Sequence, residues 1–64
     1  MDTIGQVIKT VRKQKGLKQI DVAKEMTVSQ SYISQIENEV TAPTSMFIKL
    51  FCLQYSIDEK TIIS

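Results

Sequence analysis

Apolar residues recur along the chain at intervals of three and four, the spacing that places side chains on one face of an α-helix. The clearest stripe is formed by Ile4, Val7, Ile8 and Val11. This pattern predicts an all-α fold in which residues 1–64 form one domain. Helices are expected at about residues 3–15, 18–26, 30–38, 44–54 and 57–63.

Local signals mark several ends of these helices. Thr3 followed by Gln6 has the spacing of a capping box, in which each side chain bonds the other's backbone amide at a helix N-terminus. Ser56 followed by Glu59 has the same spacing. Gly16 supplies the backbone freedom that ends a helix. The predicted boundaries therefore rest on local chemistry as well as on periodicity.

The stretch from Gln19 to Glu37 predicts two short helices joined by a tight turn at residues 26–28. In the second of them, Ile33 and Ile36 share one face and predict contact with the core. The outward face carries short, polar, uncharged side chains, where a solvated helix face ordinarily carries Lys and Glu. Such side chains suit hydrogen bonding to the edges of DNA bases. They are Ser29, Gln30, Ser31, Ser34 and Gln35.

The charge distribution points the same way. The net charge is only +1, but residues 9–18 carry five basic residues and no acidic one. Residues 19–64 carry three basic and six acidic residues. A basic segment beside the candidate helix pair fits contact with phosphates, which gains free energy through counterion release. A solvated helix face is the alternative interpretation of the same run.

Several kinds of chemistry have no support in the sequence. The chain has one cysteine and no histidine, no pairing of a nucleophile with a base, and no glycine-rich phosphate loop. We therefore expect no enzymatic activity, no metal site and no cofactor. One cysteine cannot form an internal disulfide, and neither a signal peptide nor a membrane-length apolar span is found. The expected location is the cytoplasm, without membrane contact.

The stretch from 19 to 37 resembles the helix-turn-helix of the lambda-repressor/Cro-like (XRE) family of DNA-binding regulators. The residues that carry the family pattern are Gln19, Ala23, Thr27 and Ile33, and the match extends through Ile4, Gly5, Arg12, Gly16, Leu17, Glu37, Asn38, Pro43 and residues 56–58. The resemblance implies a five-helix lambda-repressor-like domain, with the helix-turn-helix at about 18–38. It also implies double-stranded DNA as the partner.

The resemblance further implies which side chains touch DNA. Base contacts are expected from the third helix, at Gln30, Ser31, Ser34 and Gln35. Phosphate contacts are expected from Arg12, Gln19, Ser29, Tyr32 and Asn38, the last of these through the backbone amide in its vicinity. Lys18 stands where the family often has a capping Ser, Thr or Asn, and its own charge predicts a further phosphate contact.

Some of these roles have alternatives. Gln19 is either an exposed polar residue or, by resemblance, a phosphate ligand that also braces Gln30. Tyr32 either lies along the DNA backbone or packs against the second helix. Helix capping alone would explain Ser29.

The resemblance also pairs Arg12 with Glu37 as a largely buried structural ion pair, the alternative being two independent surface charges. Three positions depart from the family, because Thr27, Glu39 and Gln54 stand where it usually has Gly. Either the turn at Thr27 is built differently here, or Thr27 adopts a positive φ, which is costly for a β-branched residue. Asn38 is expected to take over the helix-ending role at the second position.

The fourth predicted helix is apolar on more than one face, so we expect part of it to meet a second copy of the chain. The residues assigned to this dimer interface, within about 44–63, are Phe47, Phe51, Ile57 and Ile62, whereas Cys52 is expected to be a buried hydrophobe. The leading hypothesis is a sequence-specific transcriptional regulator that binds a palindromic operator as a homodimer. Repression is favoured over activation. The alternative is a protein-binding module such as an antitoxin, with a toxin or an antirepressor as its partner.

Overall fold

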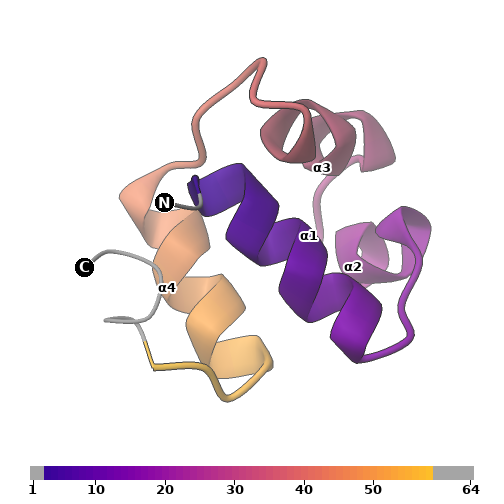
Figure 1. Ribbon diagram of the computed structural model, residues 1–64, viewed down its shortest axis with the longest axis vertical. Coiled ribbons are helices and arrows are strands. Elements are labelled where there is room, and N and C mark those ends of the chain that lie inside the picture. The colour runs from indigo at the N-terminus through magenta and orange to yellow at the C-terminus, as the bar shows by residue number, and fades with distance from the viewer. Residues whose placement is uncertain (1–2, 59–64) are drawn as a thin grey trace.

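The computed structural model describes residues 3–58, which form four α-helices (Figure 1). They are α1 (Ile4–Gln14), α2 (Gln19–Met26), α3 (Gln30–Glu37) and α4 (Ser45–Gln54). The all-α prediction is confirmed, and each of these helices lies within two residues of its predicted bounds. The predicted fifth helix is not: Ile57 and Asp58 are not helical, and the rest of it, including Ile62, lies outside the described residues.

Side-chain caps begin three of the four described helices. The Thr3 hydroxyl accepts from the Gln6 amide at 3.2 Å while the Gln6 side chain accepts from the Thr3 amide, which completes the predicted capping box. Ser29 caps α3 and Thr44 caps α4 in the same way. The side chain of Lys18, at the start of α2, has no atom that can accept a hydrogen bond, so it cannot cap this helix. Its own amide instead donates to the Asp21 carboxylate at 2.8 Å, so α2 keeps only the reciprocal half of the box.

The core lies where the four helices meet. In Figure 1, α1 runs through the middle of the molecule, with α2 and α3 on one side and α4 on the other. The buried residues of the core come from all four described helices and from the residue after α4. They are Ile8, Val22, Ala23, Ile33, Ile36, Phe47, Ile48, Phe51, Cys52 and Tyr55. None of the described helices is long and apolar enough to cross a bilayer.

Gly5 sets the distance between α1 and α3. A Cβ placed on this residue would lie 2.2 Å from the backbone oxygen of Ile36, far inside van der Waals contact. That obstacle is backbone, so it cannot rotate away as a side chain could. Only a residue without a side chain lets the start of α1 approach the end of α3 this closely.

Burial corrects the predicted dimer interface. Phe51 is 0 % exposed and Phe47 is 5 % exposed, so both rings belong to the core of a single chain. Phe47 stacks at 6.2 Å on Phe51, whose ring packs at 4.9 Å against Tyr55. The apolar side chains that α4 leaves to solvent are others, namely Met46, Leu50 and Leu53.

Tyr55 ties the end of α4 to α2. Its hydroxyl donates to the Glu25 carboxylate at 2.5 Å. Burial of the ring, reinforced by this hydrogen bond and by the negative charge of Glu25, raises the pKa of the Tyr55 hydroxyl well above its ordinary value. The hydroxyl therefore stays protonated, as a donor must, throughout the neutral range.

Each described helix is followed by a residue in the left-handed conformation, and one of these four residues is glycine. The φ values are 69° at Gly16, 59° at Thr27, 63° at Glu39 and 56° at Ser56. At Thr27 the chain closes α2 by backbone hydrogen bonds from Thr27 to Lys24 and from Val28 to Ala23. Of the two alternatives for this turn, Thr27 thus adopts the positive φ, in a residue with a branched Cβ that opposes it.

We predict that Thr27→Gly raises the free energy of unfolding by about 1 kcal/mol, because glycine adopts this φ without steric cost. Chemical denaturation followed by circular dichroism measures the change. The matched control is Thr10→Gly, the same substitution within α1, which should destabilise the domain by about 0.3 kcal/mol, the difference in helix propensity between the two residues. A loss of stability in Thr27→Gly would contradict the strain at this turn.

Candidate nucleic-acid interface

The polar face of α3 is open to solvent. Gln30, Ser31 and Gln35 are exposed and Ser34 is half-buried, while Ile33 and Ile36 on the other side of the helix are fully buried. The polar residues thus lie on the side of α3 that faces away from the core. All four side chains predicted to contact bases are brought together on one surface.

Both ends of α3 use polar groups that we had assigned to phosphates. The Ser29 hydroxyl accepts from the Tyr32 amide at 3.0 Å, so capping accounts for it, although the side chain remains exposed. At the other end the amides of residues 38–41 all donate to carbonyls of α3. The expectation that the backbone amide near Asn38 is open to a phosphate is therefore wrong.

The helix-ending role also falls to a different residue. Asn38 has φ −90° and continues the turn, whereas Glu39 adopts φ 63°. The amides of Glu39 and Val40 then donate to Ile36 and Gln35, the hydrogen-bond pattern of a left-handed helix end. The Asn38 side chain instead donates to the Ser34 hydroxyl at 3.3 Å and stays exposed.

A buried ion pair holds α3 against α1. Arg12 and Glu37, paired in the sequence analysis, are 9 % and 5 % exposed. Arg12 Nε donates to Glu37 Oε2 at 2.7 Å and Arg12 Nη2 donates to Oε1 at 3.0 Å, the two-pronged geometry that guanidinium and carboxylate favour. Arg12 Nη1 donates to the Leu17 carbonyl at 2.8 Å, and Gln19 Nε2 donates to Glu37 Oε1 at 3.1 Å.

This network changes two predicted roles. Three nitrogens of Arg12 donate within the chain and its side chain is 10 % exposed, so Arg12 is a structural residue and its assignment as a phosphate ligand is withdrawn. Gln19 is half-buried and bonds to Glu37, and within residues 3–58 no hydrogen bond joins it to Gln30. The Gln19 side-chain amide donates to the Glu37 carboxylate, because a charged acceptor forms a stronger hydrogen bond than the neutral amide oxygen of Gln30 would.

Tyr32 contacts α4, a partner that neither alternative included. Its ring meets Phe47 of α4 edge to face, with centroids 5.4 Å apart and planes at 85°. The ring is half-buried. Tyr32 therefore joins the helix-turn-helix to α4, a role that the sequence pattern did not reveal because Phe47 lies fifteen positions away.

Exposed lysines lie along α1 and in the segment that leads to α2. With Arg12 neutralised by Glu37, the positive charge of residues 9–18 comes from side chains that are all exposed: Lys9, Lys13, Lys15 and Lys18. Lys18 lies at the first turn of α2, whose N-terminal amides add a partial positive charge. These lysines are the positive charges of this segment that remain available to a polyanion.

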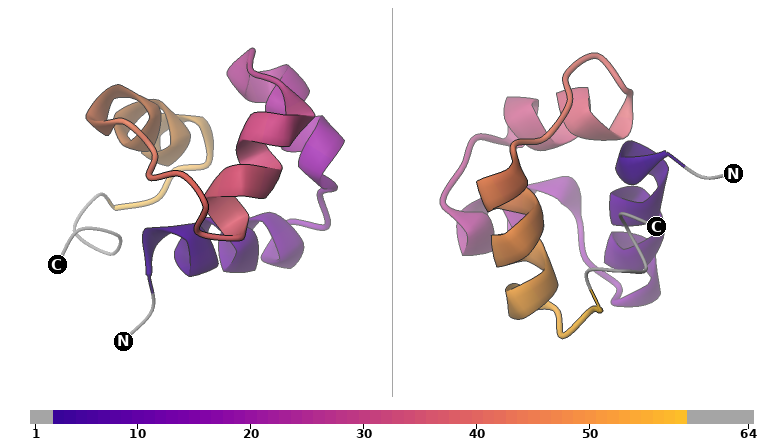
Figure 2. Two further views of the ribbon diagram at one scale, coloured as in Figure 1. Left: turned by 90° about the horizontal axis from the view of Figure 1, so that it is seen from above. Right: turned by 90° about the vertical axis from the view of Figure 1, so that its left-hand side faces the viewer.

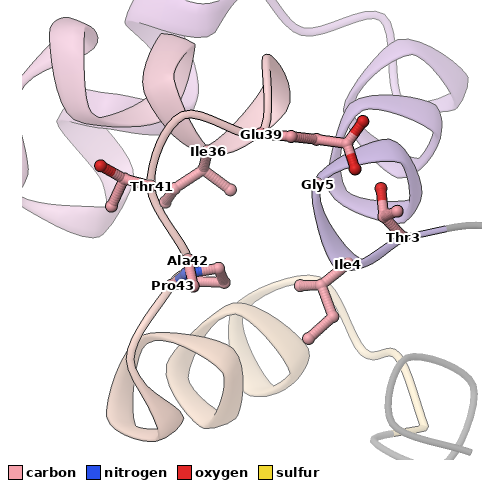
Figure 3. Close-up of a pocket in the computed structure, with 8 residues that line it drawn as sticks. All are labelled: Thr3, Ile4, Gly5, Ile36, Glu39, Thr41, Ala42 and Pro43. Atoms are coloured by element: carbon pink, nitrogen blue, oxygen red, sulfur yellow. The ribbon is translucent and has the colours of Figure 1, made fainter.

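The loop from α3 to α4 closes over a small hollow that the sequence did not predict. This hollow has a volume of about 200 Å³ and is lined by Thr3, Ile4, Gly5, Ile36, Glu39, Thr41, Ala42 and Pro43. Figure 3 shows Ala42 and Pro43 facing Ile4 across it, while the Thr41 hydroxyl is directed away. That hydroxyl donates to Gln35 Oε1 at 3.3 Å. A contact to Gln35 from beyond the helix had no signal in the sequence.

Four helices with a sharp turn between α2 and α3, and a polar face on α3, define a helix-turn-helix DNA-binding domain (Figure 2). A sequence profile described as "Helix-turn-helix" matches residues 8–60. The chain belongs to this family, the XRE type of DNA-binding transcriptional regulators, which are not enzymes.

Individual relatives agree with this assignment. The chain superimposes with a TM-score of 0.87 and 30 % identity on SinR, a master regulator for biofilm formation, in complex with DNA, covering 97 % of this chain and 100 % of that one. The N-terminal DNA-binding domain of SinR from Bacillus subtilis superimposes with a TM-score of 0.82 and 31 % identity. The match covers 95 % of this chain and 90 % of that one.

A sequence relative is the ImmF control region 10 kDa protein of Bacillus phage phi105, which is 34 % identical over 55 residues. The alignment covers 86 % of this chain and 61 % of the phage protein. The chain thus spans about three-fifths of the length of this relative.

We predict that Glu37→Ala lowers the free energy of unfolding by about 3–5 kcal/mol, because it leaves the Arg12 guanidinium buried without its carboxylate. Thermal and chemical unfolding measure the loss. A double-mutant cycle with Arg12→Ala should show strong coupling between the two sites.

The control for this prediction is Lys13→Ala, next to Arg12 but exposed, which should cost less than about 1 kcal/mol. A loss of similar size in Glu37→Ala would mean that the ion pair does not hold α3 in place.

Proposed function

We propose that this protein is a sequence-specific regulator that binds double-stranded DNA in the cytoplasm as a homodimer and represses transcription by occupying a palindromic operator. The observation that carries the proposal is the exposed, uncharged Ser/Gln face of α3, held in orientation by a buried ion pair. Likeness to SinR, whose structure with DNA is among the matches, supports DNA as the ligand.

Base reading is assigned to Gln30, Ser31, Ser34 and Gln35. The first residues of a recognition helix enter the major groove, and Gln30 and Ser31 open α3. A glutamine amide pairs with adenine N6 and N7, because it presents one acceptor beside one donor. Ser31 and Ser34 can donate to or accept from several base edges.

Phosphate binding is assigned to exposed groups at the edges of this face. Lys18 supplies a charge at the start of α2, and Ser29 and the Asn38 side chain flank α3 at its two ends. Gln19, which is half-buried, keeps a secondary role. Such contacts fix the register of the protein on the duplex without reading its sequence.

The dimer is assigned to α4. Met46, Leu50 and Leu53 follow one another at helical spacing and form a second apolar face, opposite the one buried in the core. Ile57, half-buried after α4, adjoins Leu53 and is retained at the interface. Two-fold symmetry through this face would place two copies of α3 about 34 Å apart, one turn of DNA.

The same apolar face supports the second candidate function, a module that binds another protein such as a toxin or an antirepressor. Binding to generic duplex DNA at increasing salt separates the two. A DNA-binding regulator should lose affinity steeply, since each phosphate contact releases a counterion. A module that binds only protein should show no duplex binding at any salt concentration.

We predict that Gln35→Ala relaxes the preference for one base in each half-site, at a cost of about 1–3 kcal/mol for the preferred operator. Sites selected from random duplexes identify that operator, and titrations with single-base variants measure the preference. Gln54→Ala, an exposed glutamine on α4, is the control and should leave every position unchanged. An equal loss for all sequences would show that Gln35 does not read a base.

We predict that Leu53→Glu converts the dimer to a monomer, because it places a charge in the apolar interface. The fold of the single chain should be retained, since Leu53 is 78 % exposed in it. Sedimentation velocity measures the oligomeric state, and operator affinity should fall more than affinity for an isolated half-site. Gln54→Glu adds the same charge to the same helix and should leave the dimer intact. If the Leu53→Glu protein is still a dimer, the dimer interface does not include this face of α4.

A further inference from the structure

Gln35 is held from outside its own helix. The Thr41 hydroxyl donates to Gln35 Oε1 at 3.3 Å. Thr41 lies in the loop between α3 and α4, so this contact is not part of the helical repeat. Its neighbour in the polar face is held similarly, since the Asn38 side chain donates to the Ser34 hydroxyl.

The position of Thr41 is itself fixed by the backbone. The amides of Val40 and Thr41 both donate to the Gln35 carbonyl, at 2.9 and 3.3 Å. On the other side of the loop, Ala42 and Pro43 line the hollow above the start of α1 (Figure 3). The backbone of the loop is therefore anchored to α3, and the hydroxyl reaches Gln35 from a site that does not depend on DNA.

We propose that Thr41 is a specificity-determining positioning residue, which orients the Gln35 amide for one base. This inference rests on the proposed function, because it needs Gln35 to read DNA. Thr41 itself does not contact the base. It acts by restricting the torsions of a long side chain before DNA arrives.

The chemistry of the amide explains why orientation matters. Gln35 Oε1 has two lone pairs, so it can accept from Thr41 and from a base donor at once. With the oxygen held on the side of Thr41, Nε2 presents its donors in one direction only. An unanchored glutamine can turn its amide to suit a different base, so it binds several bases with similar affinity. Anchoring thus favours the matched base without adding a contact to it.

Thr41→Val tests the proposal because it keeps the shape of the side chain and removes the hydroxyl. Preference at the position that Gln35→Ala relaxes should fall about three- to tenfold, the range expected for one hydrogen bond. The other operator positions and the salt dependence should be unchanged. Thr41→Ser keeps the hydroxyl and should retain the preference of the unaltered protein within about twofold. Circular dichroism melting verifies that each variant is folded.

The double variant Gln35→Ala/Thr41→Val separates positioning from a general structural effect. If Thr41 acts through Gln35, adding Thr41→Val to Gln35→Ala changes nothing further. The inference is overturned if Thr41→Val leaves the preference intact, weakens all sequences equally, or acts as strongly without Gln35 as with it.

The failure of the underlying function would look different. If the unaltered protein selects a defined site but Gln35→Ala relaxes no position, DNA binding stands and the role of Thr41 is overturned. If the unaltered protein selects no site from random duplexes, the proposed function falls, and this inference falls with it.

Discussion

The buried pair of Arg12 and Glu37 is the interaction on which the orientation of α3 depends. Two charges removed from water are costly unless every donor and acceptor around them is satisfied. Here the carboxylate receives three hydrogen bonds and the guanidinium also reaches the Leu17 carbonyl. Because the donors come from α1 and from Gln19 on α2, the network joins three helices at one point. The tilt of α3, and hence the direction of its polar face, follows from that junction.

Patterns that act over a few residues made the fold predictable. Apolar spacing located α1 to α4, and capping residues such as Thr3 defined starts because their hydrogen bonds span only three positions. The polar face of α3 was equally visible, since its exposed side chains repeat with the helix. The Arg12–Glu37 pairing came from family resemblance, because no periodicity links positions twenty-five residues apart.

The sequence was a poorer guide where groups compete for partners. A hydropathy pattern cannot show which apolar face of α4 is covered, and Phe47 and Phe51 turned out to fill the core while Leu50 and Leu53 stayed outside. Gln19 could bond either Gln30 or the buried carboxylate of Glu37, and only the folded arrangement reveals which partner it takes. Thr41 lies near Gln35 because the loop turns back toward α3, and no pattern in the loop sequence predicts that turn.

The left-handed residues after the helices affect the fraction of molecules that is folded. Three of the four in the described part of the chain are not glycine, and each of these conformations costs about 1 kcal/mol. A domain of this size holds only about 3–10 kcal/mol against unfolding. Relative to the same fold with glycine at those ends, roughly a hundredfold more molecules are therefore unfolded at any moment. The backbone torsions at three turns thus help to set how many copies of the protein are competent to act.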